Sequence, residues 1–510
     1  MKNFKKLFIV VFSVLMVVGL VACGKSDSGK QKEGDASSAD KKSYDKVVYA
    51  YATFNNIPSS DVLDTVAEEI NKITREKINV EVELLPIAIF DYSSSVSLTL
   101  QGGGQIDLFQ SLGDFNTSVS SDMAYDLTDL IDTYAPEAKE VLGQDFLDAC
   151  VKDGSLYGIP TYKPYALTPM VIYKQEIADE LNIDMSQVKN IFDLTDVLRK
   201  VKEAYPDMTP LVPVQTGTSG VNMTIPEVDY LTDDYYSPKG ILKGNDMTVV
   251  DYYGTSEFAD ISNLARTWYN EGLILQDAAT TTSTATELMA AANSFCYVAS
   301  YSYPPADTAA SISAQVGGIP LGAVQIGEAY LDTTSINALS WMVSSTSKVP
   351  EAALKFLNLT FTDPDIINLI IYGIKDRDYV ISEDGYVSYP EGQDASSVPY
   401  TAQLSCGTLG NFFLMHPMEG TSKESLIWEE EQNQLAKKSP AMGFTFDSSG
   451  VKTEYTAVSN VIQQYLPGLL CGSVDPEVMI PEFQNKLSEA GLDTIIEAKQ
   501  SQLDEWLKNK

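Results

Sequence analysis

The chain alternates between short apolar runs and longer segments in which apolar residues recur every three or four positions. Runs rich in β-branched and aromatic side chains predict strands, and the longer spacing predicts amphipathic helices. In the first part of the chain, the predicted elements are a strand over residues 47–54, a helix over 61–77, a strand over 80–85, a helix over 92–100 and a strand over 107–111. Ser60 is the expected N-cap of the first helix, and Pro86 is expected to end the second strand. This β-α-β-α-β order predicts a mostly parallel sheet with helices on both faces.

The same alternation continues to the end of the chain. Residues 153–160 (DGSLYGIP) predict a turn followed by a short strand that ends at Pro160. Strands are predicted over residues 170–173 and 295–299, and helices over 174–181, 193–205, 257–271, 350–361, 364–372, 476–491 and 492–510. The charge run Glu429-Glu430-Glu431 is typical of a solvated helix face. The pattern as a whole predicts an α/β chain.

The first residues read as an export signal. Lys2, Lys5 and Lys6 precede an apolar run over residues 7–20, which is too short for a comfortable membrane span. The run ends in Leu20-Val21-Ala22-Cys23-Gly24, which matches the bacterial lipobox. We therefore expect residues 1–22 to be removed as a signal peptide and Cys23 to be lipidated. A plain secretory signal with an incidental cysteine is the alternative.

Residues 24–46 contain no aliphatic side chain larger than Ala and predict a flexible tether. A lipid followed by a tether predicts a protein that is held by its anchor alone at the outer face of the cell membrane.

The charge balance narrows the possible functions. The chain has 35 Lys and Arg residues against 70 Asp and Glu residues, which gives a formal net charge of -35. So negative a surface argues against nucleic acid or anionic lipid as a partner of the folded part. The only histidine is His416, which excludes most Ser-His-Asp, Cys-His and multi-histidine metal sites. We therefore expect a protein that is not an enzyme and needs no cofactor or metal, although a carboxylate pair for glycoside hydrolysis and an adventitious Ca²⁺ stay open.

Four cysteines follow Cys23 in positions that the sequence cannot pair. Cys150, Cys296, Cys406 and Cys471 lie too far apart for a CxxC site. An exported location permits disulfides, but a chain of this length builds its cores without them, so buried free thiols are the simpler expectation.

Several motifs resemble one family. Residues 153–160 (DGSLYGIP), 268–274 (WYNEGLI) and 344–353 (SSTSKVPEAA) resemble lobe-crossing and helix-end motifs of the extracellular solute-binding lipoproteins of ABC importers, family 1 type. Three later segments resemble a subgroup with a C-terminal domain of unknown function: residues 372–379 (YGIKDRDY), 439–447 (SPAMGFTFD) and 500–506 (QSQLDEW). Residues 375–378 read KDRD where the family pattern reads EGKH, which puts any role of that loop in doubt.

This resemblance implies a two-lobed periplasmic-binding-protein fold of type II, with a hinge and a ligand cleft. Each lobe is expected to be a mostly parallel sheet flanked by helices, with extra C-terminal helices. The implied lobe one comprises residues 47–160 and about 335–380, and the implied lobe two comprises about 161–334 and 381–510. A monomer that delivers a captured solute, most often an oligosaccharide, to the permease subunits of an ABC importer is the implied function. A peptide or amino-acid-type ligand, and a surface sensor without a transporter, remain alternatives.

A sugar cleft needs polar groups for hydroxyls and aromatic faces for C–H surfaces. In open α/β sheets, such residues lie on loops beyond the carboxyl ends of strands. This rule selects the candidate ligand contacts Phe54, Asn55, Asn56, Ser111, Asp114, Tyr162, Lys163, Tyr165, Tyr301, Tyr303 and Trp341. For each aromatic residue, packing in a core is the alternative. Trp268 lies on the apolar stripe of its predicted helix and is assigned to packing.

Overall fold

The computed structural model describes residues 43–54, 57–402 and 410–509. The chain divides into two units, Met1–Ser43 and Tyr44–Lys510, and the second contains every helix and strand of the described residues. The predicted signal peptide, the lipidation site Cys23, the candidates Asn55 and Asn56, and Cys406 lie outside the described residues.

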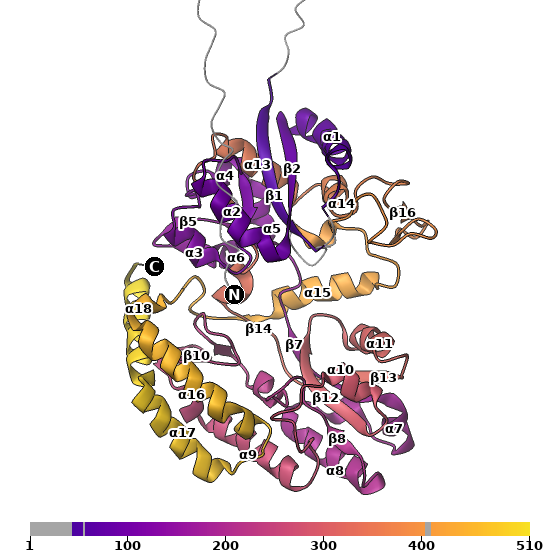
Figure 1. The fold of residues 1–510 in the computed structure, drawn as a ribbon, viewed down its shortest axis with the longest axis vertical. Coiled ribbons are helices and arrows are strands. Elements are labelled where there is room, and N and C mark those ends of the chain that lie inside the picture. Colours follow the sequence, from indigo (N-terminus) through magenta and orange to yellow (C-terminus); the bar gives the residue numbers. More distant parts are fainter. Residues whose placement is uncertain (1–42, 55–56, 403–409, 510) are drawn as a thin grey trace, which may run out of the picture. The chain divides into compact units, whose positions relative to one another are not determined.

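The first sheet, which defines lobe one, has five strands in the order β2-β1-β3-β15-β6 (Figure 1). The strands are β1 (Asp45–Thr53), β2 (Val80–Ala88), β3 (Leu108–Gln110), β6 (Ile159–Pro160) and β15 (Ser340–Val343). β2, β1 and β3 are parallel, whereas β15 is antiparallel to both β3 and β6. β2 continues through Pro86, where the sequence predicts its end, because an edge strand does not need the missing N–H on its open side.

Helices cover this sheet much as the periodicity predicts. They are α1 (Ser60–Lys77), α2 (Tyr92–Gln101), α13 (Pro350–Leu359) and α14 (Pro364–Tyr372). The N-cap of α1 is Ser59, not the expected Ser60, and its side chain makes no capping hydrogen bond. Four short helices join β3 to the hairpin that precedes β6: α3 (Phe115–Ser120), α4 (Ile131–Tyr134), α5 (Pro136–Leu142) and α6 (Gln144–Asp148). That hairpin, β4 (Val151–Lys152) and β5 (Ser155–Leu156), turns at Asp153 and Gly154, both with positive φ.

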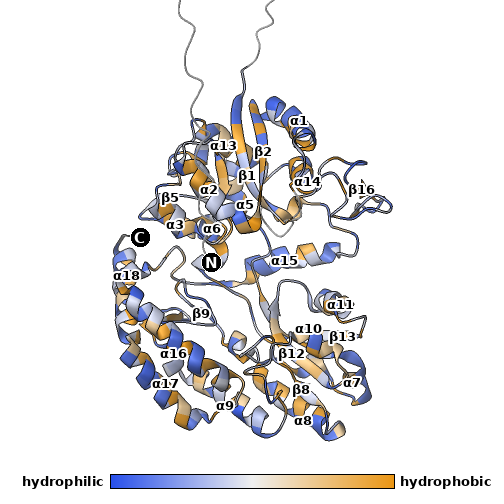
Figure 2. Ribbon diagram, viewed as in Figure 1, coloured by the Kyte–Doolittle hydropathy of each residue, from blue (hydrophilic) through white to orange (hydrophobic). Residues whose placement is uncertain are grey.

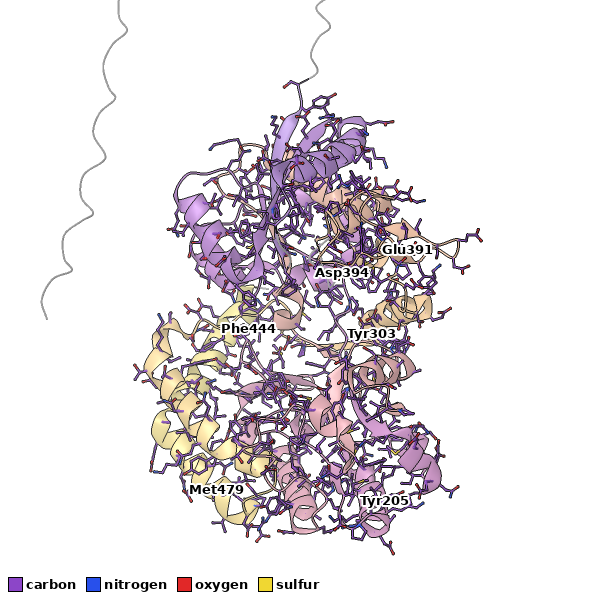
Figure 3. All side chains as sticks on the ribbon, turned by 45° about the vertical axis from the view of Figure 1, so that its right-hand side comes forward. Tyr205, Tyr303, Glu391, Asp394, Phe444 and Met479 are labelled. Carbon is purple, nitrogen blue, oxygen red and sulfur yellow. The ribbon has the colours of Figure 1, made fainter. Side chains whose placement is uncertain are left out.

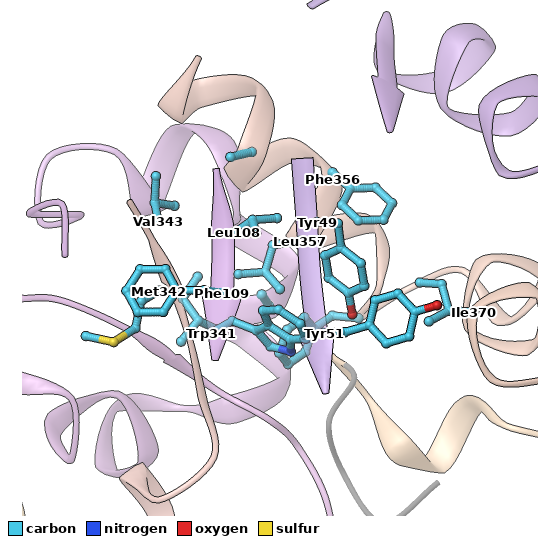
Figure 4. Packing of buried hydrophobic residues seen from close by; sticks show 14 of the residues in the cluster. Tyr49, Tyr51, Leu108, Phe109, Trp341, Met342, Val343, Phe356, Leu357 and Ile370 are labelled. Atoms are coloured by element: carbon cyan, nitrogen blue, oxygen red, sulfur yellow. The ribbon is translucent and has the colours of Figure 1, made fainter. Parts of the chain in front are cut away.

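The core of lobe one is built around an aromatic stack (Figure 4). Tyr49 from β1 stacks on Trp341 from β15 with ring centroids 4.5 Å apart, and Phe356 from α13 meets Tyr49 edge-on at 5.3 Å. All three side chains are fully buried. Strands far apart in the sequence are therefore held together by large apolar surfaces and by aromatic contacts of about 0.5–1.5 kcal/mol each.

The second sheet, which defines lobe two, has the order β13-β7-β12-β8. Its strands are β7 (Thr168–Lys174), β8 (Thr209–Leu211), β12 (Ser294–Tyr301) and β13 (Leu321–Gln325). As expected of a mostly parallel sheet, β8, β12 and β13 run in one direction, but β7 lies between β12 and β13 and is antiparallel to both. β7 carries the chain away from the crossing out of lobe one, whereas β13 leads back to the return crossing. Its helices are α7 (Gln175–Glu180), α8 (Leu194–Ala204), α9 (Ser256–Asn270), α10 (Ala285–Ala290) and α11 (Pro305–Gln315).

Three C-terminal helices extend the core of lobe two (Figures 1 and 2). α16 (Lys452–Leu470), α17 (Pro476–Ala490) and α18 (Leu492–Asn509) carry both hydrophilic and hydrophobic residues. Their apolar side chains share one cluster with Trp268 of α9, as predicted for that residue. Beside α18 lies a small sheet of β9 (Val228–Asp229), β10 (Ile241–Lys243) and β11 (Asp246–Val250). Lys499 of α18 and Asp233 form an ion pair of 2.7 Å in which both side chains are fully buried.

The segment after α14 also packs in lobe one. Val387, Tyr400 and Ala402 are part of the lobe-one core, and the Tyr400 hydroxyl bonds to the Tyr51 hydroxyl at 3.0 Å. The expected division, which gives residues 381–510 to lobe two, therefore differs from the packing, because described residues as far along as Met418 pack against the lobe-one core. This segment also forms the hairpin β16 (Val380–Ile381) and β17 (Val387–Ser388).

Three stretches of chain connect the two lobes. The first follows β6 at Pro160. The second contains β14 (Tyr330–Leu331) and α12 (Thr333–Asn337), and the third contains α15 (Lys423–Leu435) and β18 (Lys437–Lys438). β14 and β18 pair in parallel, so the second and third crossings are hydrogen-bonded to each other. Within the described residues, no helix combines the length and the apolar character that a membrane crossing requires.

Candidate functional site

A pocket of about 800 Å³ is lined by residues of both lobes. One side comes from Tyr303 and from residues along the length of α11, which packs in lobe two. The other side comes from the β16–β17 hairpin, whose Val387 lies in the lobe-one core, and from the start of α15. The lining residues are Tyr303, Asp307, Ala310, Ser311, Ala314, Ser382, Asp384, Tyr386, Ser388, Glu419, Gly420, Thr421, Ser422 and Ser425. The pocket therefore combines two aromatic rings with hydroxyls and carboxylates.

Tyr303 is placed by the end of strand β12. The chain leaves the strand after Tyr301 and enters α11 at Pro305, a position where proline fits a helix start. The hydroxyl of Thr308 donates to the Tyr303 carbonyl at 3.1 Å, which fixes the turn. The Tyr303 side chain is 42% exposed, and Figure 3 shows it far from Tyr205, which marks the opposite end of the same lobe. Part of the Tyr303 surface is thus accessible at this edge of the lobe.

The β16–β17 hairpin supplies the opposite wall. Ser382 N donates to the Tyr386 carbonyl at 2.9 Å, and Gly385 takes the positive φ that the turn needs. The hairpin is held to the next segment by the amide of Glu419, which donates to the Val387 carbonyl at 2.7 Å. The Lys423 ammonium donates to the Asp384 carbonyl and lies 4.9 Å from the centre of the Tyr386 ring.

One face of α15 joins the pocket to the crossings. Ser425, Glu429 and Asn433 lie four residues apart and are all buried. The Ser425 hydroxyl donates to the Asp307 carboxylate across the two walls of the pocket. The expectation of a solvated face is wrong for Glu429, which is 2% exposed because this face of α15 packs on lobe two. The pKa of Glu429 is raised to about 7, mainly by burial. A hydrogen bond with Ser302 opposes this increase, and the Asp307 carboxylate adds to it.

The first crossing is fastened to the same helix. The Asn433 side-chain oxygen accepts hydrogen bonds from the backbone amides of Tyr165 at 2.7 Å and Ala166 at 3.0 Å. The Asn433 amide group donates to the Lys163 carbonyl at 2.6 Å. A single buried side chain therefore satisfies three backbone groups of the crossing.

The structure separates the sequence candidates into different environments. Tyr303 lines the pocket, whereas Tyr301, two residues earlier, is half-buried and hydrogen-bonded to the Tyr297 hydroxyl at 2.6 Å. Phe54 and Asp114 are exposed near the carboxyl ends of β1 and β3, away from the residues that line the pocket.

The candidates Ser111 and Trp341 are used for packing. The Ser111 hydroxyl donates to the carbonyls of Asn337 at 3.0 Å and Ala338 at 3.1 Å. Trp341 has no accessible surface and stacks on Tyr49. In this conformation a ligand reaches neither side chain, because the strands that carry them lie inside lobe one.

The candidates Tyr162, Lys163 and Tyr165 belong to the first crossing. The Tyr162 ring packs edge-on against Phe413 at 5.2 Å, and the Tyr165 hydroxyl donates to the Thr161 carbonyl. The Lys163 ammonium lies 4.3 Å from the centre of the Tyr165 ring. These contacts position the crossing, and any contact of these residues with a ligand stays a prediction.

Sequence reasoning missed most of the pocket. Tyr386, Asp384 and Glu419 come from a hairpin and loop that follow no strand of either main sheet, so the rule of strand ends does not select them. The available signal was local: residues 382–388 (SEDGYVS) form a polar turn with an aromatic residue beside its glycine.

Metal ligands, the cysteines and His416 are the remaining chemical features that the sequence raised. Within the described ranges, no group of three or more His, Cys, Asp or Glu side chains is arranged to hold a metal ion. Cys150, Cys296 and Cys471 are buried free thiols. His416 is partly buried, its amide donates to Asn368 at 2.9 Å, and desolvation lowers its pKa.

Two family models match the chain. Residues 66–388 match the family described as bacterial extracellular solute-binding protein. Residues 440–508 match a domain of unknown function (DUF3502), which corresponds to helices α16 to α18 and the segment before them.

Individual proteins are similar over nearly the whole chain. A carbohydrate ABC transporter substrate-binding protein of Streptococcus pneumoniae serotype 4 is 26% identical over 516 aligned residues, with 100% of each chain covered. The crystal structure of the N-glycan transport solute binding protein from Streptococcus pneumoniae has a TM-score of 0.72 at 23% identity, covering 91% of this chain and 99% of that chain. An HMO binding ABC-transporter associated solute binding protein from Bifidobacterium longum infantis has a TM-score of 0.62 at 16% identity, covering 90% and 99%.

These similarities agree with the motifs noted in the sequence. The solved structures show that the chain has the fold of solute-binding proteins, which confirms the two-lobed periplasmic-binding-protein fold implied by the resemblance. The larger family match spans more than half of the chain, and its description places the protein outside the cytoplasm. The chain therefore belongs to the bacterial extracellular solute-binding protein family and carries the C-terminal domain of unknown function at its end.

Proposed function

We propose that this protein captures an extracellular oligosaccharide in the pocket between its lobes and delivers it to the permease subunits of an ABC importer. The observation that carries the proposal is the pocket itself, in a chain of this family, where the aromatic rings of Tyr303 and Tyr386 face a common space of about 800 Å³ with many hydroxyls. A space of this size holds a small oligosaccharide. The carbohydrate and N-glycan names of similar proteins support the same ligand class.

Capture needs reversible contacts from both lobes. Pyranose C–H faces pack on aromatic rings, and sugar hydroxyls both donate to carboxylates and exchange hydrogen bonds with Ser and Thr. The pocket walls belong to different lobes, so a ligand that touches both walls favours the arrangement in which they are close together. This accounts for binding and release without a chemical step on the ligand.

We further propose that the mature protein is a monomer anchored through a lipidated Cys23 after removal of residues 1–22. The lipobox Leu20-Val21-Ala22-Cys23 and the polar tether support this proposal. Globomycin treatment, or a Cys23→Ala substitution, is expected to release the protein from membranes or block its processing. Normal removal of residues 1–22 together with unchanged membrane association in both cases would contradict a lipid anchor.

A thermal-shift screen of the protein that begins at Gly24 tests the ligand class. Oligosaccharides and peptides are screened in parallel, and a ligand at 100 times its Kd adds about 2.7 kcal/mol to the free energy of unfolding. We expect shifts with oligosaccharides. Shifts with peptides alone would overturn the sugar assignment while leaving the transport role, and no shift in either set would contradict both.

Matched variants then test the place of binding. Tyr303→Ala is expected to weaken oligosaccharide binding about tenfold, since it removes one stacking face. Tyr205→Ala removes a tyrosine at the far end of the same lobe (Figure 3) and is expected to leave the Kd unchanged. Equal affinity of the Tyr303→Ala variant and the unmodified protein would rule out this wall of the pocket as the sugar site.

A further inference from the structure

The charged side chains that line the pocket all have the same sign. Asp307 comes from the first turn of α11, Asp384 from the β16–β17 hairpin, and Glu419 from the loop before α15. Among the described residues, no Lys, Arg or His side chain lines the pocket. Three separate elements from two lobes thus contribute carboxylates to one space.

A basic side chain beside the pocket is held by uncharged groups. Lys423 lies beside the pocket, but its ammonium donates to the Asp384 backbone carbonyl and packs on the Tyr386 ring. Lys423 is exposed in the first turn of α15, on the side of the helix opposite the buried face that carries Ser425 and Glu429. One lysine therefore stands against three carboxylates at the pocket.

A fourth carboxyl group lies behind the wall. Glu429 is one helical turn after Ser425, is 2% exposed, and its Oε2 has no hydrogen-bond partner among the described residues. The groups that face it are the Ser302 hydroxyl and the Asp307 carboxylate, and neither is a cation. Behind Asp307, neither of these groups supplies a positive charge to the pocket.

We propose that this pocket takes neutral sugar units and rejects sugars that carry a carboxylate, such as uronic and sialic acids. The inference rests on the proposed oligosaccharide-binding function and adds its charge selectivity. A sugar carboxylate in this space meets like charges from three directions and loses hydration without gaining a guanidinium or ammonium partner. A neutral sugar instead donates its hydroxyl protons to the same carboxylates in charge-assisted hydrogen bonds.

The test uses pairs of glycans that differ only in charge. An array of neutral oligosaccharides, each printed beside its sialylated or uronate-containing form, is probed with the protein, and the pairs that bind are measured by calorimetry. We expect the neutral member of each pair to bind at least about tenfold more tightly, the order that three carboxylates produce through a largely aqueous pocket. Equal or tighter binding of the acidic member would overturn the charge selectivity alone. Binding of no glycan would overturn the proposed function and this inference with it.

Variants assign the selectivity to these residues. The combined substitutions D307N, D384N and E419Q keep the size of each side chain and are expected to bring the affinity ratio of each pair below about threefold. The control D260N removes a carboxylate from an exposed position of α9 outside the pocket and should leave the ratio unchanged. The ratio of the unmodified protein should also shrink in 1 M salt, which screens charge but not shape. A ratio that persists in the triple variant and in high salt would show that these carboxylates do not set it.

Discussion

Replacement of Asn433 by alanine tests how the first crossing is held to α15. The substitution removes three hydrogen bonds of 2.6–3.0 Å and leaves the amides of Tyr165 and Ala166 and the Lys163 carbonyl without their partner. At about 1 kcal/mol for each bond, the free energy of unfolding should fall by about 3 kcal/mol. Asn433→Asp keeps an acceptor for both amides but buries a carboxylate against the Lys163 carbonyl without a cation, so it should also destabilise the protein.

Urea unfolding followed by tryptophan fluorescence measures these losses. Glu431→Ala is the matched control, since Glu431 is exposed on the same helix, and it should change the free energy of unfolding by less than about 0.5 kcal/mol. An Asn433→Ala variant as stable as the control would refute the reasoning, because it would mean that water or a rearranged crossing satisfies the three backbone groups equally well.

Three further changes probe other parts of the molecule. Lys499→Met leaves Asp233 as a buried charge without its partner and should cost about 3–5 kcal/mol in urea unfolding, with partial recovery when Asp233→Asn is added. Burial, together with the like charge of Asp332, raises the pKa of Asp229 above its usual value near 4, so the free energy of unfolding should fall as pH rises above that value. Asp229→Asn should reduce this fall between pH 5 and pH 8. Trp341→Ala should cost about 3–5 kcal/mol of stability, since the ring is fully buried on Tyr49; a loss of sugar affinity without a loss of stability would restore Trp341 as a ligand contact.

Much of the fold follows from local sequence patterns. The sequence predicts the helices α1, α8, α9 and α14 to within one or two residues, because each buries an apolar stripe in the core of its lobe. α15 has no such stripe, since the face it buries is made of Ser425, Glu429 and Asn433. Hydrophobic periodicity therefore does not show which face of this helix is buried.

Strand direction and the pocket depend on contacts that no local pattern encodes. β7 pairs with β12 and β13, which follow more than a hundred residues later, and only that pairing shows that β7 runs against the other strands of its sheet. Tyr303 could be predicted because it follows a strand, whereas Tyr386 reaches the same pocket through a hairpin whose place is set by packing of Val387 in lobe one. Trp341 is selected together with Tyr303, but it lies within strand β15, and its ring is buried in the core against Tyr49.

The arrangement of α15 links ligand capture to the geometry of the crossings. Ser425 contacts the Asp307 wall of the pocket, and Asn433, eight residues further along the same helical face, holds the backbone of the first crossing. The third crossing continues directly from this helix into β18, which pairs with β14 of the second. A helix transmits displacement along its axis because its hydrogen bonds keep its length fixed. For the function proposed above, α15 therefore gives a ligand in the pocket a direct structural connection to all three crossings.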